Sequence, residues 1–167
     1  MPATSLVAIG LGSSLGDRRR TLELAVLRMG TAGMHLVRAS RWYASPPLAG
    51  GTARNPFLNG VALYSTTLSP EAVLARCRAL EDAFGRRRAR HWGDRTLDVD
   101  VLQYGDRVST DADLILPHPA IARRPFVLDP LVEVWPDAID PVTGVAWATV
   151  RCDARPRPWL VGVPRRP

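Results

Sequence analysis

The chain has 167 residues, of which 46% are hydrophobic and 23% are charged. This length and composition are typical of a folded globular protein with a sizeable core, and they exclude an intrinsically disordered chain. The net charge is +6 and all 22 basic residues are arginine, so a mechanism that depends on lysine is excluded.

Several features of the sequence favour a cytoplasmic protein. No apolar run reaches the roughly 18 residues of a membrane span, and the first residues lack the basic and apolar segments of a signal peptide. Cys77 and Cys152 have no metal-ligand spacing, so we expect free thiols in a reducing cytosol, with one disulfide as the alternative. We therefore expect a single cytoplasmic domain over residues 1–167 that is monomeric and does not bind membranes. A loosely ordered Pro/Arg-rich tail is expected at residues 151–167.

The first half of the chain predicts a strand, a helix and a second strand. Residues 5–12 predict a strand that enters a glycine turn. Residues 17–30 then predict a helix, with Asp17 as its N-cap. Residues 34–45 alternate as in a strand and stop at a double proline, because proline cannot continue a sheet ladder.

The remaining elements complete a known order. Residues 57–67 predict a strand, and a helix with Ser69 as N-cap follows and ends at Gly85. A last strand lies within residues 94–105. The order β-α-β-β-α-β predicts an α+β fold of the ferredoxin-like kind, an antiparallel sheet with helices on one face. A C-terminal extension with a short helix around residues 128–134 is expected to follow.

The last of these strands carries an unusual pair of acids. Leu97, Val99 and Val101 share one face, so Asp98 and Asp100 share the other, with Cα atoms about 6.5–7 Å apart. The apolar face leads us to expect a strand internal to the sheet. Two carboxylates this close repel unless arginines, water or a divalent cation lie beside them. On spacing alone an ordinary acidic strand face remains an alternative, but the pair suits Mg²⁺ bound together with phosphates.

An arginine-rich segment precedes the acids and offers two interpretations. Its basic residues are Arg86, Arg87, Arg88, Arg90 and Arg95. With Trp92 among them, the segment resembles the aromatic and basic patches of single-strand nucleic-acid binders. Acids beside it would repel a phosphate backbone, which favours arginines that hold the phosphates of a small molecule.

Three further stretches are candidates for binding. His118 lies between prolines and before two arginines, so a phosphate contact is one interpretation and a structural role the other. Phe57 and Asn59 lie two apart on one strand face, where an aromatic ring beside an amide can bind a flat heterocycle, although taken alone the pattern favours core packing. The glycines of residues 10–17 match neither phosphate-binding glycine motif, which favours a tight turn.

Several linked motifs resemble one enzyme family. The stretch "RHWGDRTLDVDVLQYG", followed by "LPHPAIARRPFVLDPLVEVWPD", is similar to the 6-hydroxymethyl-7,8-dihydropterin pyrophosphokinases of folate biosynthesis. The resemblance extends back through "LEDAFGR", "FLNGVA" and "SPPLAG" to "IGLGSSLGD" and covers about residues 5–140. It implies transfer of pyrophosphate from ATP to the pterin hydroxymethyl group, with release of AMP.

The resemblance also implies roles for single residues. Two Mg²⁺ ions would be held by Asp98 and Asp100. Catalytic residues, mostly from a mobile loop, would be Arg86, Arg95, Trp92 and His118. Contacts to ATP would come from Glu81, Arg88, Val101, His118 and Arg124. The pterin would be bound by Ser45, Leu48, Phe57, Asn59 and Phe126, with the two phenylalanine rings on either side of it.

Two positions depart from the family pattern. Ser14 stands where the family has asparagine, and Asp94 stands where it has proline, which adds a charge and flexibility beside Arg95. The small molecules ATP and the pterin are the expected partners. A paralogue that acts on another heterocycle, and a basic module that binds nucleic acid, are the alternative functions.

Overall fold

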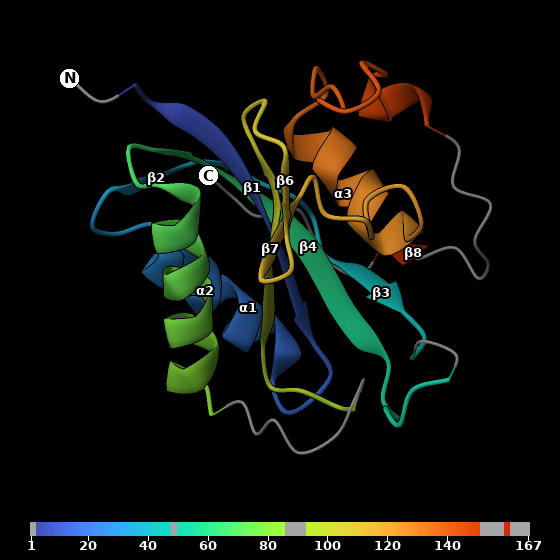
Figure 1. Ribbon diagram of the computed structural model, residues 1–167. Coiled ribbons are helices and arrows are strands. Elements are labelled where there is room, and N and C mark those ends of the chain that lie inside the picture. Colours follow the sequence, from blue (N-terminus) through green and yellow to red (C-terminus); the bar gives the residue numbers. More distant parts are fainter. Residues whose placement is uncertain (1–2, 48–49, 86–92, 151–158, 161–167) are drawn as a thin grey trace.

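The computed structural model describes residues 3–47, 50–85, 93–150 and 159–160. In chain order the elements are β1 (Ser5–Ser13), α1 (Arg18–Met29), β2 (Met34–Ala39), β3 (Tyr43–Ser45), β4 (Phe57–Thr66), α2 (Pro70–Ala83), β5 (Asp98–Tyr104), β6 (Ser109–Asp111), β7 (Leu114–Leu116), α3 (Pro125–Val134), the 3₁₀ helix η1 (Trp147–Thr149) and β8 (Trp159–Leu160). This arrangement is shown in Figure 1. No helix among these described residues is long and apolar enough to cross a membrane.

The main sheet is antiparallel, in the order β5-β1-β4-β3-β8, and β2 also pairs with β4. The predicted α+β, ferredoxin-like fold is confirmed. The central strand β1 pairs Gly12 with Asn59 of β4 on one side and with Asp98 of β5 on the other. Three segments that are far apart in the sequence therefore meet at one end of β1.

Helices α1 and α2 lie together on one face of the sheet (Figure 1). The larger core lies there and includes the fully buried Ile9, Leu22 and Tyr64. Both predicted N-caps are confirmed, since the Asp17 side chain accepts the Arg20 N–H and the Ser69 side chain accepts the Ala72 N–H. A capping oxygen satisfies a backbone donor that the first helical turn leaves unpaired.

The C-terminal extension covers the opposite face. Helix α3 packs on β4, and a second core forms around Leu128, Leu131 and Trp147. The helix begins at Pro125, three residues before the predicted start, because proline is well suited to the first helical turn. Gln103 holds η1 in place by accepting the Trp147 indole N–H at 2.7 Å.

Several expectations about the strands are wrong. The predicted strand over residues 34–45 is two strands, and the chain leaves the ladder where the Trp42 ring lies against Gly60. Of the glycines in residues 10–17, Gly10 and Gly12 lie within β1, and only Gly16, with a φ of 64°, lies in the turn before α1. Two residues of the expected loose tail form β8, which pairs with β3, and the rest of the tail lies outside the described residues.

Strand β5 is at the edge of the sheet, and the expectation of an internal strand is wrong. Among the described residues it pairs with β1 alone in this sheet. Its apolar face is buried because α2 packs against it. Glu81 of α2 accepts the Val99 N–H at 2.8 Å, so a side chain takes up this backbone donor of the edge strand.

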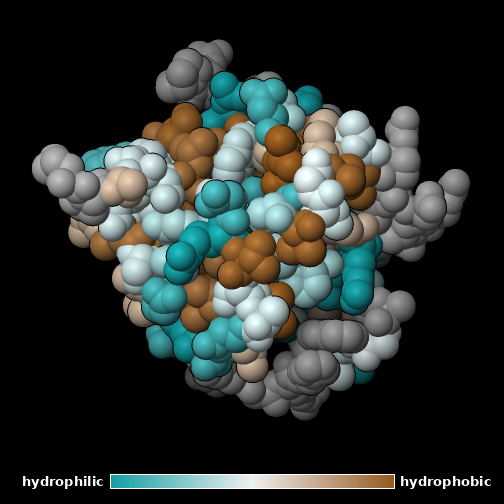
Figure 2. All heavy atoms as spheres, turned by 45° about the horizontal axis from the view of Figure 1, so that its top comes forward, coloured by the Kyte–Doolittle hydropathy of each residue, from teal (hydrophilic) through white to brown (hydrophobic). Residues whose placement is uncertain are grey.

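The outer surface shows no large apolar area on the face drawn in Figure 2, where hydrophobic side chains form small patches between polar ones. Exposed large hydrophobic side chains such as Leu27, Val37, Ile115 and Val142 come from four different parts of the chain. Scattered exposure of this kind is ordinary for a protein surface.

Candidate active site

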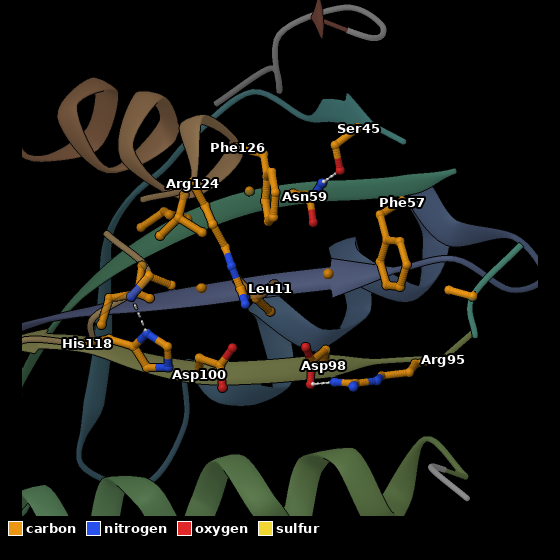
Figure 3. Close-up of a pocket in the computed structure, with 18 of the residues that line it drawn as sticks. Leu11, Ser45, Phe57, Asn59, Arg95, Asp98, Asp100, His118, Arg124 and Phe126 are labelled. Carbon is orange, nitrogen blue, oxygen red and sulfur yellow. Dashed lines mark hydrogen bonds and ion pairs between the residues drawn. The ribbon is translucent and has the colours of Figure 1, made fainter. Parts of the chain in front are cut away.

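A pocket lies on the sheet face opposite α1 and α2. Its floor is formed by β1, β4 and β5, and its wall by the first turn of α3 and by the loops before β4 and β5. In Figure 3, His118 and Arg124 lie at one end of the pocket and Phe57 and Arg95 at the other. The volume of about 300 Å³ is at the low end of the range for small-molecule sites.

The two acids of β5 point into this pocket. Val99 and Val101 are buried in the core beneath α2, and strand alternation therefore turns Asp98 and Asp100 to the pocket face (Figure 3). The Arg95 guanidinium donates to an Asp98 carboxylate oxygen at 2.8 Å, and both side chains are partly buried. An ion pair at this depth is screened less than one at the surface.

These acids fit a magnesium ion that arrives with phosphates. The described residues contain no group of three or more His, Cys, Asp or Glu side chains suited to holding a metal by itself. Mg²⁺ needs fewer protein ligands, because one or two carboxylates suffice when phosphate oxygens and water complete the shell. Two carboxylates on one strand face, open to a pocket with arginines, are such a donor set.

Glycines keep the floor of the pocket open. Gly10 and Gly12 face the pocket between the two neighbouring strands, and a Cβ atom at Gly12 would lie 3.2 Å from Asn59 Oδ1 and 3.9 Å from Asp98 Cβ. Neither glycine is among the site residues that the sequence predicts. The signal was present, since two glycines at positions i and i+2 of a strand remove side chains from one face.

Aromatic and amide groups gather at the end of the pocket near β3. Phe57 and Phe126 direct their rings into the pocket, and Asn59 lies between them in Figure 3. Asn59 Nδ2 donates to Ser45 Oγ at 2.8 Å and to the Tyr43 carbonyl at 3.3 Å. Because these bonds fix the amide, its Oδ1 atom is the edge turned toward the pocket and Gly12. An acceptor between two rings suits a flat heterocycle that carries N–H donors.

Cationic and donor groups gather at the opposite end. Arg124 extends from the start of α3 across the pocket toward β1 and β5 (Figure 3). His118 Nδ1 accepts the Ala120 N–H at 3.0 Å, which places the proton of a neutral imidazole on Nε2. Burial, and then the Arg124 charge, lower the pKa of His118 although Asp98 opposes them. Together with the positive end of α3, these groups favour an anion.

The two positions that depart from the family pattern lie in one hydrogen-bond network. Ser14 N–H donates to the Arg95 carbonyl at 2.9 Å, and Arg95 N–H donates to Ser14 Oγ at 2.9 Å. The Asp94 carboxylate accepts hydrogen bonds from Arg54 and Asn55 in the loop before β4. Burial acts to raise the pKa of Asp94, but these hydrogen bonds and one from Ser14 outweigh it and lower the pKa. The Asp94 side chain therefore joins two loops, and the expected gain in flexibility at this position stays a prediction.

Not every predicted site residue lies in the pocket. Ser45, Phe57, Asn59, Arg95, Asp98, Asp100, His118, Arg124 and Phe126 all line it. Glu81 and Val101 are instead buried on the α2 side of β5, and neither lines the pocket. Leu48, Arg86, Arg88 and Trp92 lie outside the described residues.

A family model and two relatives that match this chain all name the same kind of enzyme. The model of the family 7,8-dihydro-6-hydroxymethylpterin-pyrophosphokinase (HPPK) matches residues 8–136. A 2-amino-4-hydroxy-6-hydroxymethyldihydropteridine pyrophosphokinase of Synechocystis sp. is 41% identical over 137 residues, which cover 81% of this chain and 69% of that protein. The protein of the same name from Methylorubrum extorquens is 41% identical over 132 residues, 78% of this chain and 83% of that one.

A solved structure supports the fold. The Plasmodium falciparum HPPK-DHPS wild type with pteroate superposes with a TM-score of 0.67 at 11% identity, over 89% of this chain and 42% of that one. At this identity the likeness concerns the fold alone.

Proposed function

The chain belongs to the 7,8-dihydro-6-hydroxymethylpterin-pyrophosphokinase family, and we propose that the pocket on β1, β4 and β5 is where it carries out this family's reaction. The protein is an ATP-dependent diphosphotransferase of folate biosynthesis that transfers pyrophosphate from ATP to the hydroxymethyl group of 6-hydroxymethyl-7,8-dihydropterin and releases AMP. The observation that carries the assignment of the site is the pair of acids, Asp98 and Asp100, between an anion-binding end and an aromatic end.

We assign the triphosphate to the end with His118 and Arg124. His118 holds its proton on Nε2 and so donates to a phosphate oxygen, and Arg124 adds a fixed positive charge. Arg95, held by Asp98, lies farther along the pocket, where the transferred group meets its acceptor. Cationic groups held in place before the reaction stabilise charge that develops during it without further reorganisation.

We assign the pterin ring to the space between Phe57 and Phe126. Ring faces that stack on both sides of a heterocycle fix its plane, and Asn59 Oδ1 accepts one of its N–H groups. The absence of a side chain at Gly12 leaves the ring room beside that acceptor. The hydroxymethyl group then projects along the floor toward the acids. Phosphoryl-type transfer depends mostly on this positioning and on charge stabilisation.

Magnesium is part of this proposal. Asp98 and Asp100 would hold Mg²⁺ against the phosphates, and the resemblance implies two ions. When bound, such ions neutralise phosphate charge and help to align an in-line displacement. Leu48, Glu81, Arg86, Arg88, Trp92 and Val101 keep the roles that the resemblance implies as predictions. The cytoplasmic location and the monomeric state also stay predictions.

The assignment is tested by following AMP formation from ATP, Mg²⁺ and the pterin. Asp98→Asn and Asp100→Asn remove charge without changing shape, and each should lower kcat by about 100-fold or more. Asp106→Asn is the matched control, because Asp106 is exposed at the other end of β5 and should leave the rate unchanged. Full activity in either acid variant would overturn the site assignment.

The two alternative functions give different results in the same experiments. A nucleic-acid-binding module would show steep salt-dependent affinity for RNA that survives Asp98→Asn. A paralogue for another heterocycle would bind a nonhydrolysable ATP analogue in calorimetry but would not bind the pterin.

A further inference from the structure

Asp94 joins two loops that are far apart in the sequence. Its Oδ1 atom accepts the Asn55 N–H at 3.1 Å, and its Oδ2 atom accepts the Arg54 N–H at 3.2 Å and Asn55 Nδ2 at 3.0 Å. Three donors from the loop between β3 and β4 therefore converge on one carboxylate of the segment before β5. Hydrogen bonds to a charged acceptor are stronger than those between neutral groups.

Both joined loops form part of the pocket. Ala53 contributes to the lining immediately before the two donor residues, and Gly93 and Arg95 contribute to it on either side of Asp94. The carboxylate itself is not a lining group. Any effect of this carboxylate on the pocket therefore passes through the two wall segments that it joins.

Each of the two loops is also held by a hydrogen bond to another part of the protein, so the carboxylate links two segments that are already anchored. Ser14 holds the backbone of Arg95 through two hydrogen bonds of 2.9 Å. Arg18 of α1 donates to the Pro56 carbonyl at 2.8 Å. Between these anchors, Asp94 provides a direct side-chain link from one loop to the other.

We propose that Asp94 is a positioning residue that holds the wall of the pterin end of the pocket in its binding shape, an inference that rests on the proposed function. The pterin end is indicated because Phe57 follows the donor residue Asn55 by two positions, whereas His118 and Arg124 lie at the opposite end in Figure 3. When the wall is already ordered before binding, the ligand does not have to offset the entropy lost in ordering these loops. Asp94 therefore contributes to affinity for the pterin and not to affinity for ATP.

The first test separates the two substrates. Asp94→Ala should raise the KM for the pterin by about five- to tenfold, since it removes hydrogen bonds to a charged acceptor. The KM for ATP and kcat should change less than about twofold, because Ser14 continues to hold Arg95. Asp94→Asn should show most of the same loss, because its amide group would face donors. Asp106→Ala makes the same change of charge at an exposed site and should have no effect.

A double-mutant cycle tests whether the effect passes through the loop. Asn55→Ala removes one of the three hydrogen bonds and should raise the KM for the pterin less than Asp94→Ala does. The double variant should match Asp94→Ala alone, because Asn55 acts through the same carboxylate. Fully additive effects, or equal changes in the KM values of both substrates, would overturn the proposal.

Hydrogen exchange provides a readout that does not depend on the reaction. The amides of Arg54 and Asn55 should exchange faster in Asp94→Ala than in the wild type, and unchanged exchange would refute the link. This distinguishes the two possible failures. If the wild-type protein neither binds the pterin nor forms AMP, the proposed function fails. If it does both and Asp94→Ala leaves the KM for the pterin unchanged, the positioning role fails.

Discussion

A single methyl group on the floor of the pocket should separate pterin binding from folding. Gly12 lies in β1 and is not among the glycines with positive φ, so alanine fits its backbone. Its new Cβ atom would lie 3.2 Å from Asn59 Oδ1 and 3.8 Å from the Phe57 ring. Gly12→Ala therefore places an apolar group against the acceptor that we assign to the pterin.

The expected loss of affinity for the pterin follows from the contact between this Cβ atom and Asn59 Oδ1. A methyl group at 3.2 Å prevents a ligand N–H from approaching the Asn59 oxygen along the same direction. Leaving a ligand donor unpaired in the pocket costs about 1–3 kcal/mol, which is roughly a 5- to 150-fold loss of affinity. The folded protein should lose little, because the methyl group points into the pocket and not into a packed core.

The assay is a titration of the pterin in the presence of a nonhydrolysable ATP analogue, together with urea unfolding. Gly10→Ala is the matched control on the same strand face, where the new Cβ atom meets the Leu102 side chain at 3.2 Å. That contact involves neither Asn59 nor Phe57, so affinity for the pterin should fall much less. If Gly12→Ala binds the pterin as tightly as the wild type does, Asn59 Oδ1 is not its acceptor.

Three further predictions concern stability. Burial lowers the pKa of His118 below its usual 6.5, so the unfolded chain binds more protons at this residue than the folded protein does. The free energy of unfolding, measured by urea titration, should therefore fall as the pH drops below about 6.5, and His118→Gln should make that fall smaller. Glu81→Ala leaves the Val99 N–H without its carboxylate acceptor and should lower the free energy of unfolding by about 1.5–3 kcal/mol in urea. A decrease below about 0.5 kcal/mol, as at an exposed site, would show that this hydrogen bond contributes little. Ser69→Ala removes the N-cap of α2 and should cost about 1 kcal/mol in the same assay, with Ser69→Asp retaining most of the stability if the capping oxygen is responsible.

The alternation of β5 shows both what local patterning predicts and where it fails. Leu97, Val99 and Val101 correctly predict a buried face and, by alternation, a polar face with Asp98 and Asp100. The same pattern led to the expectation of an internal strand. It fails there because a helix that covers one face buries side chains whether or not both strand edges are paired.

Local patterns along the chain were enough to predict the order of the main elements, both helix caps and the face on which the two acids lie. These features depend on neighbours a few positions apart, where backbone preferences and side-chain alternation act directly. Its linked motifs also identified the family.

The three-dimensional fold was needed to show how those pieces form a pocket. It brought Gly12 between Asn59 and Asp98, placed α3 over the second face, and joined Asp94 to a loop 39 and 40 residues away. None of these contacts has a local signature, since each depends on which strands pair and on which face each connection crosses. Asp94 is the clearest case, because its neighbours in sequence suggest a mobile charge and its neighbours in space make it a link between two loops.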